Sequence, residues 1–229
     1  LHDALPISGA NADTVLPRVV RAYLNGSNSL IVQFNEPVNT GTASLVTNYF
    51  VNNGIGQPAL ALPLAYDYTT VRLQFLQNFQ SGIIYTVTAT NGITDCTGNS
   101  IDMNDSARFA VPDSISPNDV VINEILFNPK TYGYDFVELY NRSNKVIDLK
   151  QLDIAEKDVS DPSLVLEIGN ISVESFLLFP NEFVVLSEQP SNVQQNYFVE
   201  NPEQLLPMSL PNFPDKEGIC VLKIHNGAT

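Results

Sequence analysis

The sequence contains no tryptophan, two histidines, two methionines and two cysteines among 229 residues. The histidines are His2, in an atypical first segment, and His225, close to the last residue, so histidine-based catalysis is not expected. The HExxH, GxSxG and Walker signatures of zinc, nucleophile and phosphate sites are also missing. Without tryptophan a typical aromatic platform for sugars is disfavoured, whereas nine tyrosines leave a tyrosine-based platform open.

Positive charge is scarce as well, since 11 Lys and Arg residues stand against 25 Asp and Glu residues, giving a formal net charge of −14. A chain this acidic is repelled by nucleic acids and by anionic membrane surfaces. No run approaches the roughly 18 consecutive apolar residues of a membrane-spanning helix. We therefore expect no nucleic acid partner, no membrane insertion and no cofactor.

Long helical segments and a disulfide framework are equally absent from the pattern. No stretch combines caps with a sustained 3.6-residue periodicity. Cys96 and Cys220 lie in different predicted domains, so we expect two independent thiols rather than a bridge. Fifteen prolines and twelve glycines instead indicate many short strands joined by turns.

Short alternating apolar runs are what the sequence has in abundance. In the first part of the chain, the expected strands cover 19–24, 29–34, 47–51, 59–65, 70–76, 83–90 and 107–111. About seven strands over about ninety residues are typical of a Greek-key β-sandwich. In the second part, the expected strands cover 120–127, 136–140, 146–149, 164–168 and 218–224, with an irregular insertion or short helix at 187–207.

These runs predict an all-β chain of two antiparallel β-sandwich domains in tandem, at 15–112 and 119–229. The polar stretch 113–118, with Pro112 before it and Pro117 within it, is interpreted as a short, stiff linker. Residues 1–14 are interpreted as an assembly scar or a disordered leader and are excluded from the fold prediction.

Three motifs in the first predicted domain carry a family resemblance. They are F-N-E-P-V at 34–38, Y-T-V-T at 85–88 and D-C-T-G-N at 95–99. In this order they resemble the bacterial Ig-like domain of surface-layer proteins, the SbsA-like class. The resemblance implies an Ig-like sandwich over 15–112.

The second predicted domain resembles a lamin-tail domain, which is also an Ig-like β-sandwich. The motifs are I-N-E-I at 122–125, F-V-E-L-Y-N at 136–141, D-L at 148–149 and L-F-P-N-E-F-V-V-L at 178–186. Leu152 stands where the family has Trp and is expected to be a smaller core residue, and Asn181 replaces Gly at a left-handed turn. Family members continue with one more strand, so we expect this domain to lack its closing strand and to expose the edge of the strand at 218–224.

Together the two resemblances imply a modular bacterial protein that is extracellular or at the cell surface. The leading hypothesis is a non-catalytic structural or adhesive module, whose partner would be a cell-surface protein or a glycan. One alternative is an accessory module of a secreted nuclease, phosphatase or glycosidase whose catalytic domain lies elsewhere. The other is a glycan-binding module that uses Tyr and Asn side chains.

Two groups of acidic residues are candidates for a catalytic or a metal-binding site. Glu124 and Glu138 fall on neighbouring predicted strands, and paired carboxylates perform acid–base chemistry in glycosidases. The favoured interpretation is structural, with the two side chains facing solvent or pairing with Asn123, Asn141 and Arg142.

The second group could bind Ca²⁺, which prefers clustered oxygen ligands. Its members are Asp95, Asp102, Asn104 and Asp105. Their spacing fits no EF-hand loop. The favoured interpretation is a turn in which Asp95 and Asn99 bind backbone amides and Gly98 supplies a positive φ.

Overall fold

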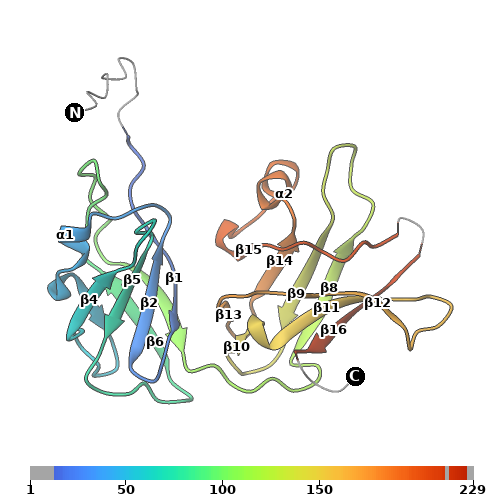
Figure 1. The fold of residues 1–229 in the computed structure, drawn as a ribbon, viewed down its shortest axis with the longest axis horizontal. Coiled ribbons are helices and arrows are strands. Elements are labelled where there is room, and N and C mark those ends of the chain that lie inside the picture. Colours follow the sequence, from blue (N-terminus) through green and yellow to red (C-terminus); the bar gives the residue numbers. More distant parts are fainter. Residues whose placement is uncertain (1–12, 215–216, 226–229) are drawn as a thin grey trace. The chain divides into compact units, whose positions relative to one another are not determined.

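The structure is a computed structural model of the chain, and it describes residues 13–214 and 217–225 (Figure 1). The chain forms two compact units, one of residues 13–79 with 84–109 and one of 80–83 with 110–225. The predicted all-β class is confirmed, since α1 (Thr40–Ala43) and α2 (Pro190–Asn196) are the only α-helices among the described residues. Within the described ranges, no helix is long and apolar enough to cross a membrane.

The first unit contains two sheets. One has the order β1-β2-β5-β4 with antiparallel neighbours, and the other has the order β3-β6-β7. Their bounds are β1 (Val19–Leu24), β2 (Ser29–Phe34), β3 (Tyr49–Val51), β4 (Leu60–Pro63), β5 (Thr70–Gln74), β6 (Ile84–Ala89) and β7 (Asp105–Ala110). Strands β1 and β2 follow the expected bounds, because Gly26 at φ +121° closes the tight turn between them.

An aromatic cluster joins the two sheets of the first unit. Phe79 packs edge-to-face on Phe75, Tyr85 and Phe109, with ring centroids 5.0–5.2 Å apart. Phe75 directly follows β5 of one sheet, while Tyr85 and Phe109 belong to the other, so these rings form a shared core.

Both faces of β2 are largely buried. Ile31 lies on the face opposite Leu30 and Val32, and only 3% of its surface is exposed. Strand β2 lies between β1 and β5, and the register places Tyr23 and Arg72 on either side of Ile31. The long side chains of these neighbours cover it.

The second unit also contains two main sheets, with the orders β15-β14-β9-β8 and β12-β11-β16, and a short pair β10-β13. Their bounds are β8 (Val120–Leu126), β9 (Phe136–Asn141), β10 (Ile147–Asp148), β11 (Leu152–Lys157), β12 (Val165–Asn170), β13 (Leu177–Leu178), β14 (Phe183–Ser187), β15 (Leu205–Pro207) and β16 (Ile219–Ile224). Leu139 of β9 and Ile154 of β11 share one buried cluster, so the two sheets pack face to face.

Several elements of the second unit differ from expectation. Strand β11 was not predicted as a strand, and the run 146–149 contains only β10 before a 3₁₀ turn (Leu149–Gln151). The stretch 187–207 holds α2, a 3₁₀ turn (Pro202–Gln204) and β15, which pairs with β14 in parallel. A parallel pair forms here because the intervening helical segment brings the chain back to the same end of the sheet.

Two local expectations from the second unit are present in the structure. Leu152 is a core residue with 3% of its surface exposed. Asn181 adopts φ +63°, the left-handed conformation expected at its turn.

The stretch expected to be a linker is bound to the second unit. The backbone N–H of Asp113 donates to the carbonyl of Val146 at 2.8 Å, and its side chain accepts the N–H of Val146 at 3.0 Å. The Gln151 side chain donates to the carbonyl of Asp113 at 2.9 Å and accepts the N–H of Ile115 at 3.1 Å. These reciprocal bonds give the stretch a fixed course along the second unit.

Candidate functional sites

Asp95 organises the turn at 95–99 with both carboxylate oxygens. Its Oδ1 accepts the backbone N–H groups of Thr97, Gly98 and Asn99 at 2.8, 2.6 and 2.8 Å. Its Oδ2 accepts the Thr97 hydroxyl at 2.9 Å and the Asn99 amide at 2.7 Å, and Gly98 adopts φ +98°. Burial by itself would raise the pKa of Asp95, but these hydrogen bonds to the charged form outweigh it and lower the pKa to about 2.

The residues hypothesised to join Asp95 in a Ca²⁺ site differ in their exposure and in their hydrogen bonds. Asp102 and Asn104 are exposed, and Asp105 accepts the backbone N–H groups of Val19 at 2.7 Å and Ser106 at 2.9 Å. Within the described ranges, neither Asp102 nor Asp105 belongs to a group of three or more potential metal ligands. Asp105 instead attaches the start of β1 to β7.

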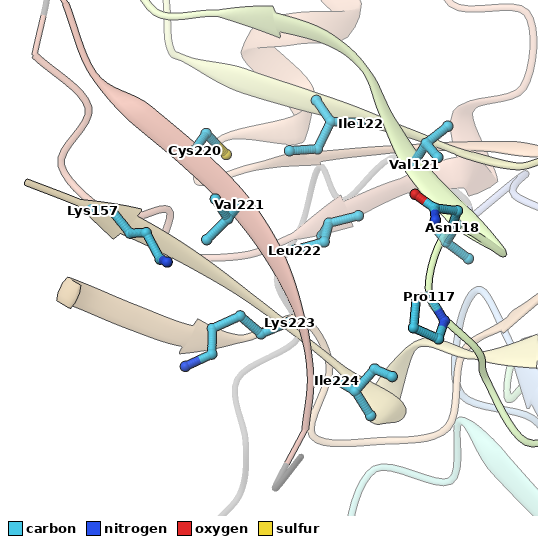
Figure 2. Close-up of a pocket in the computed structure, with 11 residues that line it drawn as sticks. Pro117, Asn118, Val121, Ile122, Lys157, Cys220, Val221, Leu222, Lys223 and Ile224 are labelled. Carbon is cyan, nitrogen blue, oxygen red and sulfur yellow. The ribbon is translucent and has the colours of Figure 1, made fainter. Parts of the chain in front are cut away.

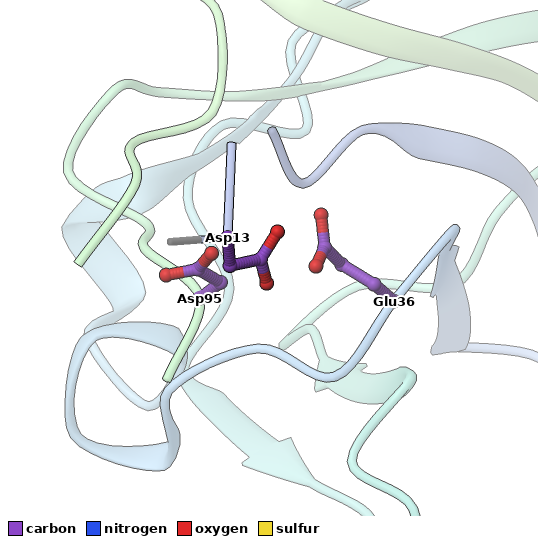
Figure 3. Close-up of side chains that lie close together, drawn as sticks. All are labelled: Asp13, Glu36 and Asp95. Carbon is purple, nitrogen blue, oxygen red and sulfur yellow. The ribbon is translucent and has the colours of Figure 1, made fainter. Parts of the chain in front are cut away.

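Asp95 converges with two other carboxylates, Asp13 and Glu36 (Figure 3). One oxygen from each residue lies within 4.8 Å of the others. Asp13 is exposed, Glu36 is half-buried and Asp95 is buried. The Oε1 atom of Glu36 is buried without a hydrogen-bond partner in the described part of the chain. Burial, then the charges of Asp13 and Asp95, raise the pKa of Glu36 above its ordinary value.

Oxygen atoms within 4.8 Å of one another can bind one hard cation, since Ca²⁺–oxygen distances are about 2.3–2.6 Å. An ionised carboxylate has about four lone-pair positions, and Asp95 already accepts five hydrogen bonds. Asp95 is therefore committed to its turn, whereas the side chain of the exposed Asp13 accepts the N–H of Val15 at 3.0 Å and Glu36 has an unpartnered oxygen. The linear sequence does not indicate this grouping, because Glu36 falls within the F-N-E-P-V motif and Asp13 lies before the predicted domain at 15–112.

Glu124 and Glu138 are direct neighbours across β8 and β9, as the sequence suggested. The Asn123 side chain donates to Oε1 of Glu138 at 2.6 Å, while Glu124 is exposed. The register shifts between Ile122 and Glu124, which places Asn123 at a bulge beside Glu138. Glu124 and Glu138 are therefore two like charges at the sheet surface, and Glu138 accepts a hydrogen bond from the Asn123 amide.

Asn141, expected beside these carboxylates, is buried in the core. Its Nδ2 donates to the carbonyls of Lys145 at 2.8 Å and Leu178 at 2.9 Å. Its Oδ1 accepts the N–H of Ser143 at 3.0 Å and the hydroxyl of the same residue at 2.7 Å. Asn141 thus satisfies buried backbone groups from two segments, a role the linear sequence does not reveal.

Exposed aromatic rings border a groove of about 540 Å³ on the β14 side of the second unit. Phe183 stacks on Tyr140 with ring centroids 4.5 Å apart, and Phe198 exposes 93% of its surface. Asn181 accepts a hydrogen bond from the Tyr140 hydroxyl at 3.1 Å. Aromatic faces next to amide side chains are a surface on which a sugar ring can pack.

A second groove, of about 760 Å³, lies between β8 and β16 (Figure 2). Ile122 lines it from β8, and Cys220 and Leu222 line it from β16. The lamin-tail resemblance predicts an exposed edge at 218–224, and Val137 and Leu139 of β9 are by contrast fully buried. Every residue of β16 is partly or fully exposed, although β8 is also only half-buried over much of its length.

The two cysteines are free thiols. Cys96 is exposed, whereas Cys220 is half-buried in the β8–β16 groove. Burial raises the pKa of Cys220 to about 12, so its thiol is protonated at neutral pH.

Comparison with known proteins bears on the first unit. Residues 14–111 match the family model of the bacterial Ig-like domain. The Ig-like assignment made from the three motifs is therefore confirmed for this domain. The finer SbsA-like assignment and the lamin-tail resemblance of 119–229 stay predictions. No curated protein matches the chain.

Among solved structures, the chain is similar to parts of the S-layer protein SbsC. The N-terminal part of SbsC matches with 16% identity and a TM-score of 0.38, over 73% of this chain and 45% of that one. The rSbsC(31-844) structure and the structure of SbsC domains 1–6 each match with 15% identity and a TM-score of 0.39. These two matches cover 73% and 74% of this chain and 26% of each SbsC chain, so the chain spans less than half the length of its structural neighbours.

Proposed function

We propose that this chain is a non-catalytic structural or adhesive module of a larger bacterial protein that is exported to the cell surface or secreted. The observation that carries the proposal is the match of residues 14–111 to the bacterial Ig-like domain. Ig-like sandwiches recur in many cell-surface proteins as rigid units that present loops and edges. A fold alone does not assign a function, so the proposal also depends on what the acidic side chains do.

The use of those side chains supports a structural role. The carboxylate of Asp95 accepts backbone N–H groups of its own turn, and the carboxylate of Asp105 accepts the N–H of Val19 at the start of β1. Asn123 holds Glu138 at the sheet surface. Each of these groups stabilises local backbone or a neighbouring side chain, whereas a general acid or base needs its proton-transfer position free.

The proposal is tested by assaying the whole chain against nuclease, phosphatase and glycosidase substrates. We expect no turnover above buffer. The variant Glu138→Gln should change stability modestly and leave any measured binding unchanged, with Glu124→Gln as its matched control. Turnover that disappears in Glu138→Gln would overturn the non-catalytic assignment.

Glycan binding is a second candidate, favoured by the groove beside Phe183 and Phe198. A glycan array probed with the whole chain tests it. Binding that Phe198→Ala removes, while Tyr132→Ala leaves it intact, would support this function, since both side chains are more than 90% exposed. The accessory-module alternative remains a prediction, which sequencing of the complete gene product would test.

A further inference from the structure

We infer that the groove of about 540 Å³ on the β14 side of the second unit binds an arginine side chain of a partner polypeptide. The guanidinium would pair with Glu200, donate to Gln204 and stack on Phe183, which all line the groove. The inference goes beyond the proposed function, because it assigns a ligand to a named site. It applies equally to an adhesive module and to an accessory module of an enzyme.

The floor of the groove is the face of the sheet that points away from the core. Val184 and Leu186 of β14 belong to the buried cluster, so Phe183 and Val185 point to the opposite face. The ring of Phe183 packs on Tyr140, its partner in β9, and 43% of the Phe183 surface stays exposed. Because this contact orients the ring, Phe183 offers a platform on which a flat cation can stack.

The lining of the groove is acidic. It includes Glu138, Glu182 and Glu200, and the described lining residues include no Lys, Arg or His. Glu138 accepts the Asn123 amide at 2.6 Å, and Glu182 accepts the N–H of Phe179 at 3.0 Å. Glu200 is exposed and forms no hydrogen bond or ion pair with any residue that the structure describes. The groove therefore attracts a cation, and Glu200 is the carboxylate available to pair with it.

Gln204 adds an unsatisfied acceptor to this lining. Its Oε1 atom is buried without a hydrogen-bond partner in the described ranges. A buried acceptor without a donor is unfavourable, and a ligand N–H that reaches it removes this penalty. The last side-chain torsion of glutamine is broad, so the amide can turn its oxygen toward the groove. The ligand is thus expected to carry several N–H donors as well as a positive charge.

A guanidinium meets these requirements better than other groups. It is planar and weakly hydrated, it stacks on aromatic faces, and its five N–H donors can be shared between a carboxylate and an amide oxygen. The ammonium of lysine is compact and strongly hydrated, so it gains less from Phe183. A neutral glycan would pack on the rings but would leave the charge of Glu200 uncompensated, so the acidic lining favours the cation.

The observations favour an arginine within a polypeptide over the free amino acid. Free arginine carries its own carboxylate, which the three carboxylates of the groove repel, whereas in a peptide that group is an uncharged amide. Phe198, which exposes 93% of its surface, and the apolar Val185 and Leu205 can contact the residues on either side of the arginine. A second copy of this chain, with its net charge of −14, would instead bring repulsion.

The test titrates the whole chain with the blocked peptide Val-Val-Arg-Val-Val in a calorimeter. The controls are the same peptide with citrulline or lysine at the centre, since citrulline keeps the shape of arginine without its charge. We expect the arginine peptide to bind about tenfold or more tighter than the citrulline peptide, and the lysine peptide to lie between them. Free arginine should bind more weakly than the blocked arginine peptide. Added salt should narrow the gap between arginine and citrulline, because the pair with the exposed Glu200 is screened.

Variants separate the contributions of the charge and of the ring. Glu200→Gln should weaken the arginine peptide about tenfold and leave the citrulline peptide unchanged. Glu188→Gln, which alters an exposed carboxylate that follows β14 outside the groove, should leave both unchanged. Phe183→Leu keeps an apolar side chain but removes the ring, so it should abolish the advantage of arginine over lysine. Circular dichroism melts confirm that each variant is folded before it is titrated.

Four outcomes would overturn the inference. They are equal binding of the arginine and citrulline peptides or binding of neither, unchanged affinity for the arginine peptide in Glu200→Gln, and free arginine that binds as tightly as the peptide. The fourth is a neutral glycan that displaces the arginine peptide and binds Glu200→Gln as well as the wild type, because the groove would then be a glycan site. None of these outcomes bears on the non-catalytic assignment, which the turnover assays test separately.

Discussion

Oxygen atoms of Glu36 and Asp95 lie within 4.8 Å of one another, and the pKa values of the two carboxyls are displaced in opposite directions. Asp95 is held in its charged form by the turn that it organises, against the effect of its own burial. Glu36 has an unpartnered buried oxygen and faces the charges of Asp13 and Asp95, so its charged form is disfavoured. One carboxylate stabilises the fold when ionised, and the other destabilises it.

Replacing Glu36 should therefore stabilise the chain at neutral pH. A group whose folded pKa is raised destabilises the fold when ionised, so the effect is absent below the unfolded value of 4.5 and complete above the folded pKa. For a partly exposed group, relief of this repulsion is worth about 0.2–1 kcal/mol, or about 1–4 °C in Tm. We expect Glu36→Gln to raise Tm at pH 7 in chelator-containing buffer and to have little effect at pH 3.5. Asp102→Asn is the matched control, and an equal rise in that variant would contradict the explanation.

Replacing Asp95 should have the opposite effect. Its lowered pKa contributes stability that is present above the unfolded value of 3.8 and lost as the pH falls through about 2. We expect Asp95→Ala to lower Tm more than Asp95→Asn at pH 7, because the asparagine retains one acceptor oxygen. Calorimetric scans between pH 7 and pH 2 should show the wild type and Asp95→Asn converging at the acid end. A gap that stays constant down to pH 2 would show that the charge of Asp95 is not what stabilises the turn.

Asn141→Ala should destabilise the second unit by about 1–3 kcal/mol, because the buried carbonyl of Leu178 and the partly buried carbonyl of Lys145 lose their donor. Asn123→Ala removes an exposed amide from the adjacent strand and should cost no more than about 0.5 kcal/mol. Denaturant unfolding measures the loss of stability in each variant, and hydrogen exchange in β9 and β13 shows where that loss occurs. Similar losses of stability in the two variants would contradict the role assigned to Asn141.

Cys96 should react with iodoacetamide well before Cys220 in the native chain. With a pKa of about 12, only about one part in ten thousand of the Cys220 thiol is ionised at pH 8. Mass spectrometry of timed samples should show labelling of Cys220 only after denaturant is added, and Cys96→Ser isolates its rate. Rapid native labelling in Cys96→Ser would mean that the β8–β16 groove opens far more than its packing indicates.

Local signals were sufficient for much of the fold. The strands at 19–24 and 29–34 match β1 and β2, and Leu152 and Asn181 behave as their positions in the motifs predicted. Alternating side chains, turn glycines and an aspartate that caps its own turn act over a few residues. The all-β class, most strand positions and the turn at Asp95 therefore follow from local sequence.

Which distant residues meet depends on how the strands pack in three dimensions. This packing brought Asp13 and Glu36 to Asp95, placed the Asn141 amide against the carbonyls of Lys145 and Leu178, and paired β15 with β14 in parallel. It also brought β8 and β16 to one groove. Periodicity shows that a segment is a strand but not which strand lies next to it, because pairing depends on contacts between residues far apart in the chain.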